Sequence, residues 1–194
     1  LSPREVVDRA VALQGQDLPA VLRAIALRSA PGTTVDDVRA AFDSGELVRS
    51  WPMRGTLFAT TPEHLASLLA LTGTRTLQSM ARRREQLGLD DATIDRAHEV
   101  AVAALETAPL RRADILATWE DAGISTDGGR GYHLLVHLCI NGLAHWGAFA
   151  PDGSEQYLTL TATQRDTDTD AALSRIVAGY VAARGPVTLD DLAW

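Results

Sequence analysis

The sequence contains no lysine, a single cysteine and no long apolar run. Its 18 basic residues are therefore all arginine, and with 25 acidic residues the formal net charge is −7. The lone Cys139 excludes internal disulfides and zinc modules built on cysteine ligands. Without a long apolar run or a signal-like start, the chain predicts no transmembrane helix, and we expect a cytoplasmic protein that does not contact a membrane.

The composition is otherwise that of an ordinary globular protein. Of the 194 residues, 46% are hydrophobic and 22% are charged, which excludes collagen-like and disordered classes. This length suits one domain or two small ones.

The acidic excess is uneven along the chain. Arginines and acidic residues number seven and seven in residues 1–60, eight and eleven in 61–130, and three and seven in 131–194. Bulk acidity argues against general coating of nucleic acid, yet a polyanion could still meet residues 1–130 locally. The densest basic run there is Arg82, Arg83 and Arg84, which also fits a solvated helix face.

Residues 1–60 predict three helices followed by two short strands. Ser2 and Pro3 suit the start of a helix, whose apolar stripe continues at helical spacing to Leu13. The predicted elements are helices at about 3–13, 19–28 and 34–43, and strands within 47–60. This order is that of a winged helix, a relative of the helix-turn-helix.

The same order restarts twice after three further helices at about 62–71, 75–87 and 91–106. Two helices from Ala108 lead to a second pair of strands around a hairpin turn at 151–154, and a third start follows the linker 166–170. The string Gly-Pro-Val-x-x-x-Asp-Leu-Ala echoes Ala-Pro-Leu-x-x-x-Asp-Ile-Leu, 186 − 109 = 77 positions earlier. The last helix is cut off without a C-cap, so we expect a fragment of a longer protein.

These patterns predict a mainly α protein with small β-wings, made of tandem winged-helix units. We place a first unit with its following helices at 1–106, a second unit at 107–165, and the start of a third at 166–194.

Four stretches resemble the AlkZ/YcaQ-type proteins, which carry tandem winged helices and include DNA glycosylases. The most specific is the run Trp51-Pro52-Met53-Arg54-Gly55-Thr56-Leu57, preceded by Leu13-Gln14-Gly15-Gln16-Asp17. The others are the helix at Pro109 with its later wing and the terminal Arg184-Gly185-Pro186…Asp191-Leu192-Ala193-Trp194. Together they span nearly the whole chain, and relatives continue well beyond Trp194.

The resemblance implies a catalytic pair at Gln14 and Gln16, because the family's glycosylases use a Gln–apolar–Gln motif. It also implies damaged double-stranded DNA as the partner, no cofactor, and a protein that we expect to be monomeric. The chain departs from the family at two positions: Gly15 stands where a larger apolar residue is usual, and Phe58 stands where many relatives have histidine.

Such a site would hydrolyse the bond between an alkylated base and its sugar. An alkylated purine already carries positive charge and leaves readily, so neutral amides suffice to position water and contact the sugar. A glycosylase that also cuts the strand normally uses a lysine amine, and these residues contain none. Only hydrolysis is therefore available within them.

The helical prediction sets a geometric condition on this pair. Residues two apart do not face the same way on a helix, so Gln14 and Gln16 converge only if the helix ends or distorts there, which Gly15 permits. The alternative is that both glutamines are simply an exposed helix end. Asp17 is either a base beside Gln16 or the cap of the helix that starts near Pro19.

Further candidates are weaker. We assign DNA contacts to Arg49, Arg54 and Thr56 in the first wing and to Arg82, Arg83 and Arg84, although ordinary ion pairs explain these arginines equally well. His133 and His137 are four apart, a spacing that can bind zinc, but no third ligand stands out and we predict no metal. Trp51, Trp119 and Trp146 fit core or wing packing, with Trp51 also able to line a site.

A second functional class is a non-enzymatic winged-helix DNA-binding regulator, and a third possibility is an inactive family member that binds damaged DNA. A regulator would need a basic recognition helix in each unit. The helix at 131–138 is apolar, which weakens that alternative and suits a scaffold.

Overall fold

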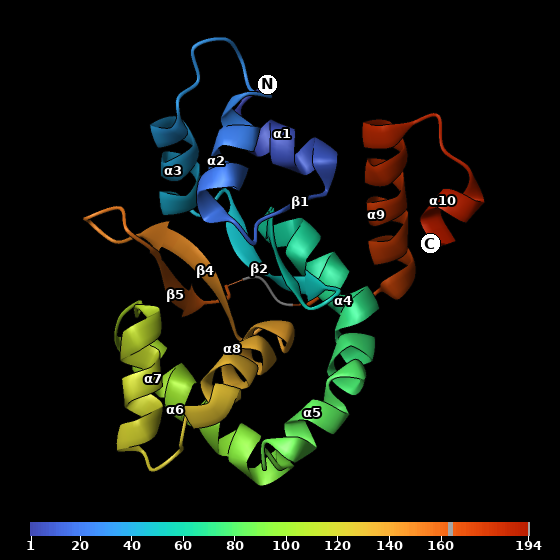
Figure 1. Cartoon of the computed structure of the whole chain (residues 1–194). Helices are drawn as coiled ribbons and strands as arrows, with labels where there is room; N and C mark the ends of the chain where they lie inside the picture. Colours follow the sequence, from blue (N-terminus) through green and yellow to red (C-terminus); the bar gives the residue numbers. More distant parts are fainter. Residues whose placement is uncertain (163–164, 194) are drawn as a thin grey trace.

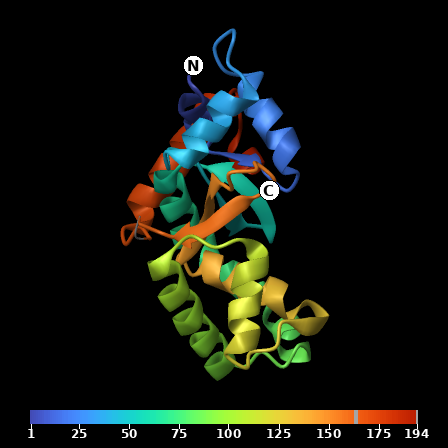
Figure 2. The ribbon, with the colours of Figure 1, turned by 90° about the vertical axis from the view of Figure 1, so that its left-hand side faces the viewer.

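The computed structural model describes residues 1–162 and 165–193, and it confirms a mainly helical chain with a small antiparallel sheet (Figure 1). The sheet has five strands in the order β1-β3-β2-β4-β5, so the wings of the first two units form one continuous sheet. Arg49 pairs with Trp146 where the two wings meet. Turned by 90°, the molecule shows the first helices at one end and the second set at the other, with the sheet between them (Figure 2).

The first half contains three helices and three strands. Capping boxes start the first and third helices, at Ser2 with Glu5 and at Thr34 with Asp37, as the sequence indicates. The elements are α1 (Pro3–Ala10), β1 (Ala12–Gln14), α2 (Leu18–Ala26), α3 (Val35–Asp43), β2 (Val48–Met53) and β3 (Thr56–Thr60).

The prediction that the first helix continues to Leu13 is wrong. The helix ends at Ala10, and Val11 has φ 66° and ψ −54°, a γ-turn conformation that is strained for a β-branched residue. The following residues form β1, in which Ala12 pairs with Thr60 and Gln14 pairs with Phe58. Pairing with β3 prevails here because the apolar residues from 11 to 13 fit a buried strand as well as a helix.

The second half repeats this order. A single bridge between Leu110 and Leu158 takes the place of β1. In this order the helix at 91–107 corresponds to α1 and is described with the second half. The unit boundaries at 107 and 166 stay a prediction. The elements are α6 (Asp91–Thr107), α7 (Arg112–Asp121), the short η1 (Asp127–Gly129), α8 (Arg130–Ile140), β4 (Ala144–Phe149) and β5 (Gln156–Leu160).

Two helices connect the halves, α4 (Pro62–Ser79) and α5 (Ala81–Gln86). The predicted break between 71 and 75 does not occur, and the chain bends instead at Met80. Gly73 lies inside α4, where a Cβ would lie 3.1 Å from Nη2 of Arg165, so the glycine leaves room for the guanidinium that donates to the Ile140 carbonyl.

The C-terminal helices, where the start of a third unit is predicted, pack beside the first half. The helix α9 (Thr169–Arg184) contacts α4 and α1, and α10 (Leu189–Ala193) follows it. The contact is tight at Gly179, where a Cβ would lie 2.5 Å from Cγ2 of Val11. Among the described residues, no helix is long and apolar enough to cross a membrane.

Candidate active site

The segment after β1 stays hydrogen-bonded to β3 through one backbone bond and one side-chain bond. The backbone N–H of Gly15 donates to the Leu57 carbonyl at 2.7 Å, and the Leu57 N–H donates to Oε1 of Gln16 at 3.3 Å. The Gly15 carbonyl, which would complete a normal antiparallel pair, accepts from Nη1 of Arg49 at 3.0 Å instead. These bonds fix the Gln16 amide with its oxygen toward β3 and leave its NH₂ group to other partners.

Gly15 has a steric reason to be glycine. A Cβ at this position would lie 3.0 Å from the Ala59 nitrogen and 3.3 Å from Cδ of Arg49. The space that a larger apolar residue would need at position 15 is therefore filled by the backbone of β3 and the side chain of Arg49.

The strand register separates the two glutamines. Gln14 pairs with Phe58 and so shares its face of the sheet, whereas Leu57 and Gly15 belong to the opposite face. Gln16 turns toward Leu57 and lines a pocket on that opposite face, and Gln14 is not part of its lining. The two side chains thus flank the end of β1 from its two sides, and both are exposed.

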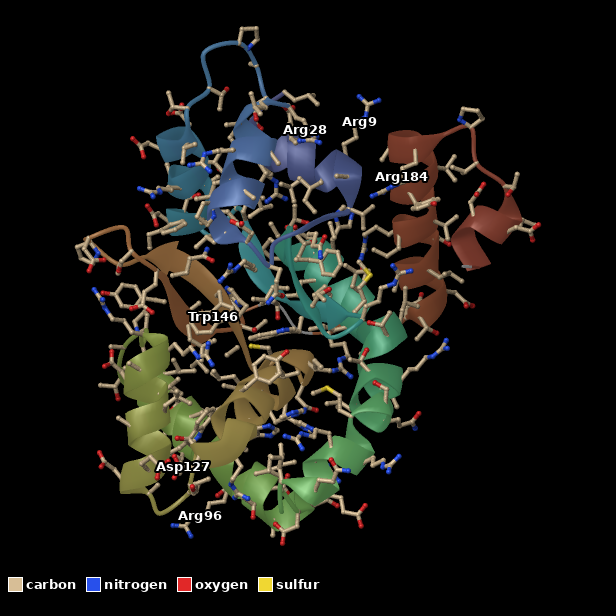
Figure 3. The ribbon with its side chains drawn as sticks, viewed as in Figure 1. Arg9, Arg28, Arg96, Asp127, Trp146 and Arg184 are labelled. Carbon is tan, nitrogen blue, oxygen red and sulfur yellow. The ribbon has the colours of Figure 1, made fainter. Side chains whose placement is uncertain are left out.

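The pocket that Gln16 lines has a volume of about 330 Å³ and lies where the two halves meet. Trp146, labelled at mid-height on the left of Figure 3, comes from β4, and Tyr132 and Leu135 come from α8. The rings of Trp51 and Tyr132 meet edge to face with their centroids 5.9 Å apart. The lining residues are Gln16, Leu18, Arg49, Trp51, Leu57, Arg112, Tyr132, Leu135, Trp146, Ser154, Glu155 and Gln156.

Arg49 brings positive charge into this pocket. No carboxylate lies within ion-pair distance of it among the described residues. Burial lowers the pKa of its guanidinium to about 10, which still leaves it protonated at neutral pH. Arg49 therefore joins the pocket and the glutamine segment, whereas sequence reasoning placed it on the wing as a DNA contact.

Asp17 caps α2. Its Oδ1 accepts from the Ala20 N–H at 2.9 Å, as expected of an N-cap, and Asp17 is not part of the pocket lining. Of the two roles that the sequence left open for this carboxylate, capping is the one that the structure displays.

The remaining candidate DNA contacts lie on separate elements. Arg54, at the β2–β3 turn with φ 56°, is exposed, and Thr56 begins β3. Arg82 and Arg83 on α5 are exposed as well, whereas Nη2 of Arg84 forms an ion pair with Oδ1 of Asp91 at 2.9 Å. The structure does not bring the α5 arginines to the pocket.

No group of three or more metal-ligating side chains occurs within residues 1–162 and 165–193. His137 is buried on α8, and desolvation lowers its pKa to about 4, so it is neutral at pH 7. Burial lowers the pKa of His133 too.

The tryptophans divide between core and site. Trp119 is a core residue whose Nε1 donates to the Ala97 carbonyl at 2.9 Å, as the packing prediction has it. Trp51 and Trp146 line the pocket, and so do Tyr132 and Gln156, which sequence reasoning missed. Only the β2–β4 pairing brings these residues together, and that pairing leaves no local sequence signal.

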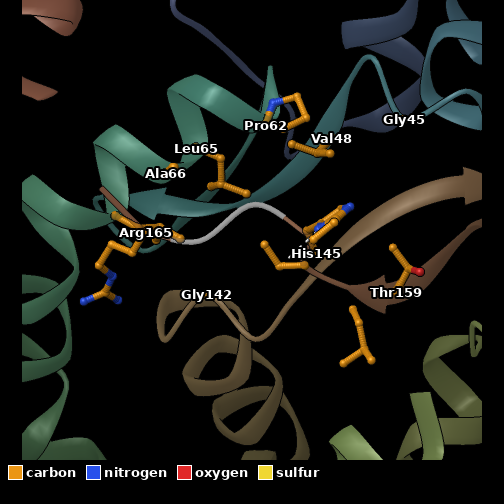
Figure 4. Close-up of a pocket in the computed structure, with 13 residues that line it drawn as sticks. Gly45, Val48, Pro62, Leu65, Ala66, Gly142, His145, Thr159 and Arg165 are labelled. Carbon is orange, nitrogen blue, oxygen red and sulfur yellow. Dashed lines mark hydrogen bonds between the residues drawn. The ribbon is translucent and has the colours of Figure 1, made fainter. Parts of the chain in front are cut away.

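A second pocket, of about 300 Å³, lies between α4 and the β4–β5 hairpin (Figure 4). It is mostly apolar, and three of its polar side chains have partners: Nδ1 of His145 lies 3.2 Å from Oγ1 of Thr161, and Arg165 donates to the Ile140 carbonyl. None of the unpartnered buried polar atoms of the described residues belongs to its lining. We therefore take the pocket at Gln16 as the candidate site.

Fold and site together define a tandem winged-helix protein with an aromatic pocket beside a pair of glutamines. The model of the family "DNA glycosylase AlkZ-like" matches residues 7–194, and the chain belongs to this AlkZ-like family. The fold is similar to that of the solved Streptomyces sahachiroi DNA glycosylase AlkZ, with a TM-score of 0.77 and 22% sequence identity. That match covers 98% of this chain and 53% of the solved chain, so the residues described span about half its length. No curated protein matches.

Proposed function

We propose that the protein is a monofunctional DNA glycosylase that hydrolyses the N-glycosidic bond of alkylated bases. The observation that carries this proposal is the Gln16 amide, fixed by the Leu57 N–H at the mouth of an aromatic pocket. Membership of the AlkZ-like family supports the reaction class.

The two glutamines act on the sugar from the two sides of β1. As the bond breaks, the sugar develops positive charge and an alkylated purine departs as a neutral base. The amide oxygen of Gln16 is engaged with Leu57, so its NH₂ orients the base or sugar, while Gln14 from the other side orients the attacking water. Because the sequence contains no lysine, these residues offer no amine for a Schiff base.

Double-stranded DNA meets the protein through arginines on both sides of the site. Arg54 and Thr56 at the β2–β3 turn contact the backbone near the lesion, and Arg82 and Arg83 on α5 contact phosphates further away. Arg49 approaches the lesion from inside the pocket, and the paired Arg84 adds less. The protein acts as a monomer without a cofactor, because the catalytic groups come from one chain.

The test is base release from DNA that carries an N7-alkylated purine, using the full-length protein. We expect Gln16→Ala and Gln14→Ala each to reduce the single-turnover rate about 100-fold, which corresponds to about 2.7 kcal/mol. Gln78→Ala is the matched control because Gln78 is exposed on α4, away from the pocket. No release by the wild-type protein across several alkyl adducts would refute the proposal.

A non-enzymatic winged-helix regulator is less well supported. The third helix of each half would have to read a groove, yet α8 is largely buried and α3 carries three acidic residues and one arginine.

A further inference from the structure

The pocket at Gln16 adjoins a second hollow beside the β4–β5 turn. This neighbouring pocket has a volume of about 210 Å³ and lies among α2, α3 and the turn. The two pockets have Leu18 and Ser154 in common, so they meet between the start of α2 and the turn. We call the two together the hairpin groove.

The hairpin groove gathers positive charge on a chain whose net charge is −7. Among the described residues, one carboxylate lines it, Glu155, and this side chain forms an ion pair with Nη1 of Arg111 at 3.2 Å. Against it stand four arginines that line the two parts of the groove: Arg23 and Arg39 in the second hollow, and Arg49 and Arg112 in the pocket at Gln16. The groove is therefore locally basic although the chain is acidic.

The fold brings a basic side chain to the turn from the opposite helix. Arg39 is the one arginine of α3, and its Cζ atom lies 5.3 Å from the centroid of the Phe149 ring in β4. A Cβ at Gly153 would lie 3.1 Å from Nη1 of Arg39, so the guanidinium reaches the turn itself. Its ion pair with the exposed Asp36 is long, at 3.7 Å, and leaves the guanidinium open to a stronger partner.

Two of the four arginines are fully accessible. Arg23 on α2 and Arg112 at the start of α7 are exposed, and neither side chain has an ion-pair or hydrogen-bond partner within residues 1–162 and 165–193. One belongs to the second hollow and the other to the pocket at Gln16. Both parts of the groove thus offer N–H donors that a ligand from solution can reach.

We propose that the hairpin groove binds the DNA strand that carries the lesion, with its phosphates at Arg23, Arg39 and Arg112. A strand brings one negative charge per nucleotide, and a guanidinium binds phosphate oxygens through two parallel N–H groups. A cationic base alone would gain nothing from these arginines, whereas the strand that delivers it is attracted. Apolar side chains between them, such as Leu18 and Phe149, suit the sugars and bases of the strand.

Continuity with the pocket at Gln16 selects this strand over its complement. The lesion nucleotide is covalently joined to its neighbours, so the hollow that adjoins its pocket at Leu18 and Ser154 receives the next nucleotides of the same strand. The inference rests on the proposed function, which places the lesion at Gln16, and it adds the path of the strand across the β4–β5 turn.

Binding of the full-length protein to a duplex with a central tetrahydrofuran abasic-site analogue tests the inference. Fluorescence anisotropy at several salt concentrations gives the affinity and its salt slope. Arg23→Gln and Arg112→Gln should each weaken binding about fivefold at about 0.1 M salt and lower the slope by about 0.9, because each removes one phosphate contact. Arg9→Gln is the matched control: Arg9 is exposed on α1, labelled in Figure 3, does not line the groove, and should leave both values unchanged.

Methylphosphonate linkages, each of which removes the charge of one phosphate, then identify the strand. A linkage at the phosphate that Arg23 binds should weaken binding of the wild-type protein and have no further effect on Arg23→Gln. Arg112→Gln should show the same loss of effect at a second phosphate. We expect both phosphates on the strand that carries the abasic site.

Coupling to phosphates of the complementary strand, no coupling at any phosphate, or an equal loss of affinity in Arg9→Gln would each overturn the inference. Thermal unfolding should be the same for all three variants, because the replaced side chains are exposed and unpaired, and this separates lost binding from lost folding. The proposed function fails separately: strand coupling without base release from alkylated DNA contradicts the glycosylase, whereas base release without strand coupling contradicts only the groove.

Discussion

The two halves of the sheet follow the same order of elements and differ in which element is buried. In the first half a strand, β1, lies between the first two helices, and α3 buries three of its nine residues. In the second half one bridge at Leu110 replaces that strand, and α8 buries eight of its eleven residues. The same order of elements thus gives an accessible edge strand, β1, with two glutamines at its end in the first half. In the second half it gives a buried helix, α8, beside the pocket.

The difference shows how two halves with the same order of elements take different roles. Because β1 is an edge strand, Gln14 and Gln16 stay accessible at its end. Because α8 buries eight of its eleven residues, the buried Leu135 forms a firm wall of the pocket, beside the partly exposed Tyr132. The first half supplies the proposed chemistry and the second half supplies the shape, so each can be perturbed separately.

The largest effect is expected from the packed helix. Leu138→Ala in α8 should lower the free energy of unfolding by about 2–5 kcal/mol, because Leu138 is fully buried and a cavity remains. Asp36→Ala on the exposed side of α3 should change it by less than about 0.5 kcal/mol. Urea unfolding measures both, and similar costs at the two positions would erase the distinction between the helices.

Acid should weaken the second half first. Burial lowers the pKa of His137 and of His145 to about 4 from 6.5. The unfolded chain therefore binds more protons between these values, and stability falls as the pH drops from 6.5 toward 4. For His145 the full shift corresponds to about 3 kcal/mol.

Hydrogen exchange at pH 7 and pH 5 measures this effect element by element. Amides of α8 and β4 should lose more protection at pH 5 than those of α3, and His145→Asn should reduce the loss. Uniform loss over both halves would contradict the assignment.

Gly15, between the two glutamines, should tolerate an added methyl group less well than Gly147 in the second wing. Gly15→Ala places a Cβ 3.0 Å from backbone and should cost about 1–3 kcal/mol, with loss of base release as Arg49 moves. Gly147→Ala comes closest to the Thr159 methyl, at 3.3 Å, with the His145 ring at ordinary contact distance, and should cost less. Thermal unfolding of the two variants compares them, and an equal or smaller cost at Gly15 would argue against the close approach to β3.

The smallest effect concerns the exposed arginines of α5. Arg82→Ala combined with Arg83→Ala should leave stability within about 0.5 kcal/mol. It should reduce the slope of log affinity for duplex DNA against log salt by about 0.9 for each phosphate that the variant no longer neutralises. An unchanged slope would remove α5 from the DNA interface.

Much of the fold could be predicted because capping and turn chemistry are local. Ser2 and Thr34 each cap a helix where the sequence indicates one, whereas α9 begins at Thr169, inside the predicted linker 166–170. The strand β1 escaped prediction because its three residues take their conformation from β3, far away in sequence. The glutamine motif was accessible through its resemblance to a family, whereas the pocket depends on the pairing of Arg49 with Trp146, a contact between units with no sequence pattern of its own.

The strained Val11 links the helix α9 to the strand β1. Its carbonyl accepts from Oγ1 of Thr60 at 2.7 Å, and its side chain fills the space above Gly179 in α9. A backbone strained by about 1–3 kcal/mol persists only while its surroundings hold it. Any side chain larger than hydrogen at Gly179 would press on that turn, so a mutation in α9 would shift the strand that carries Gln14, three residues beyond Val11.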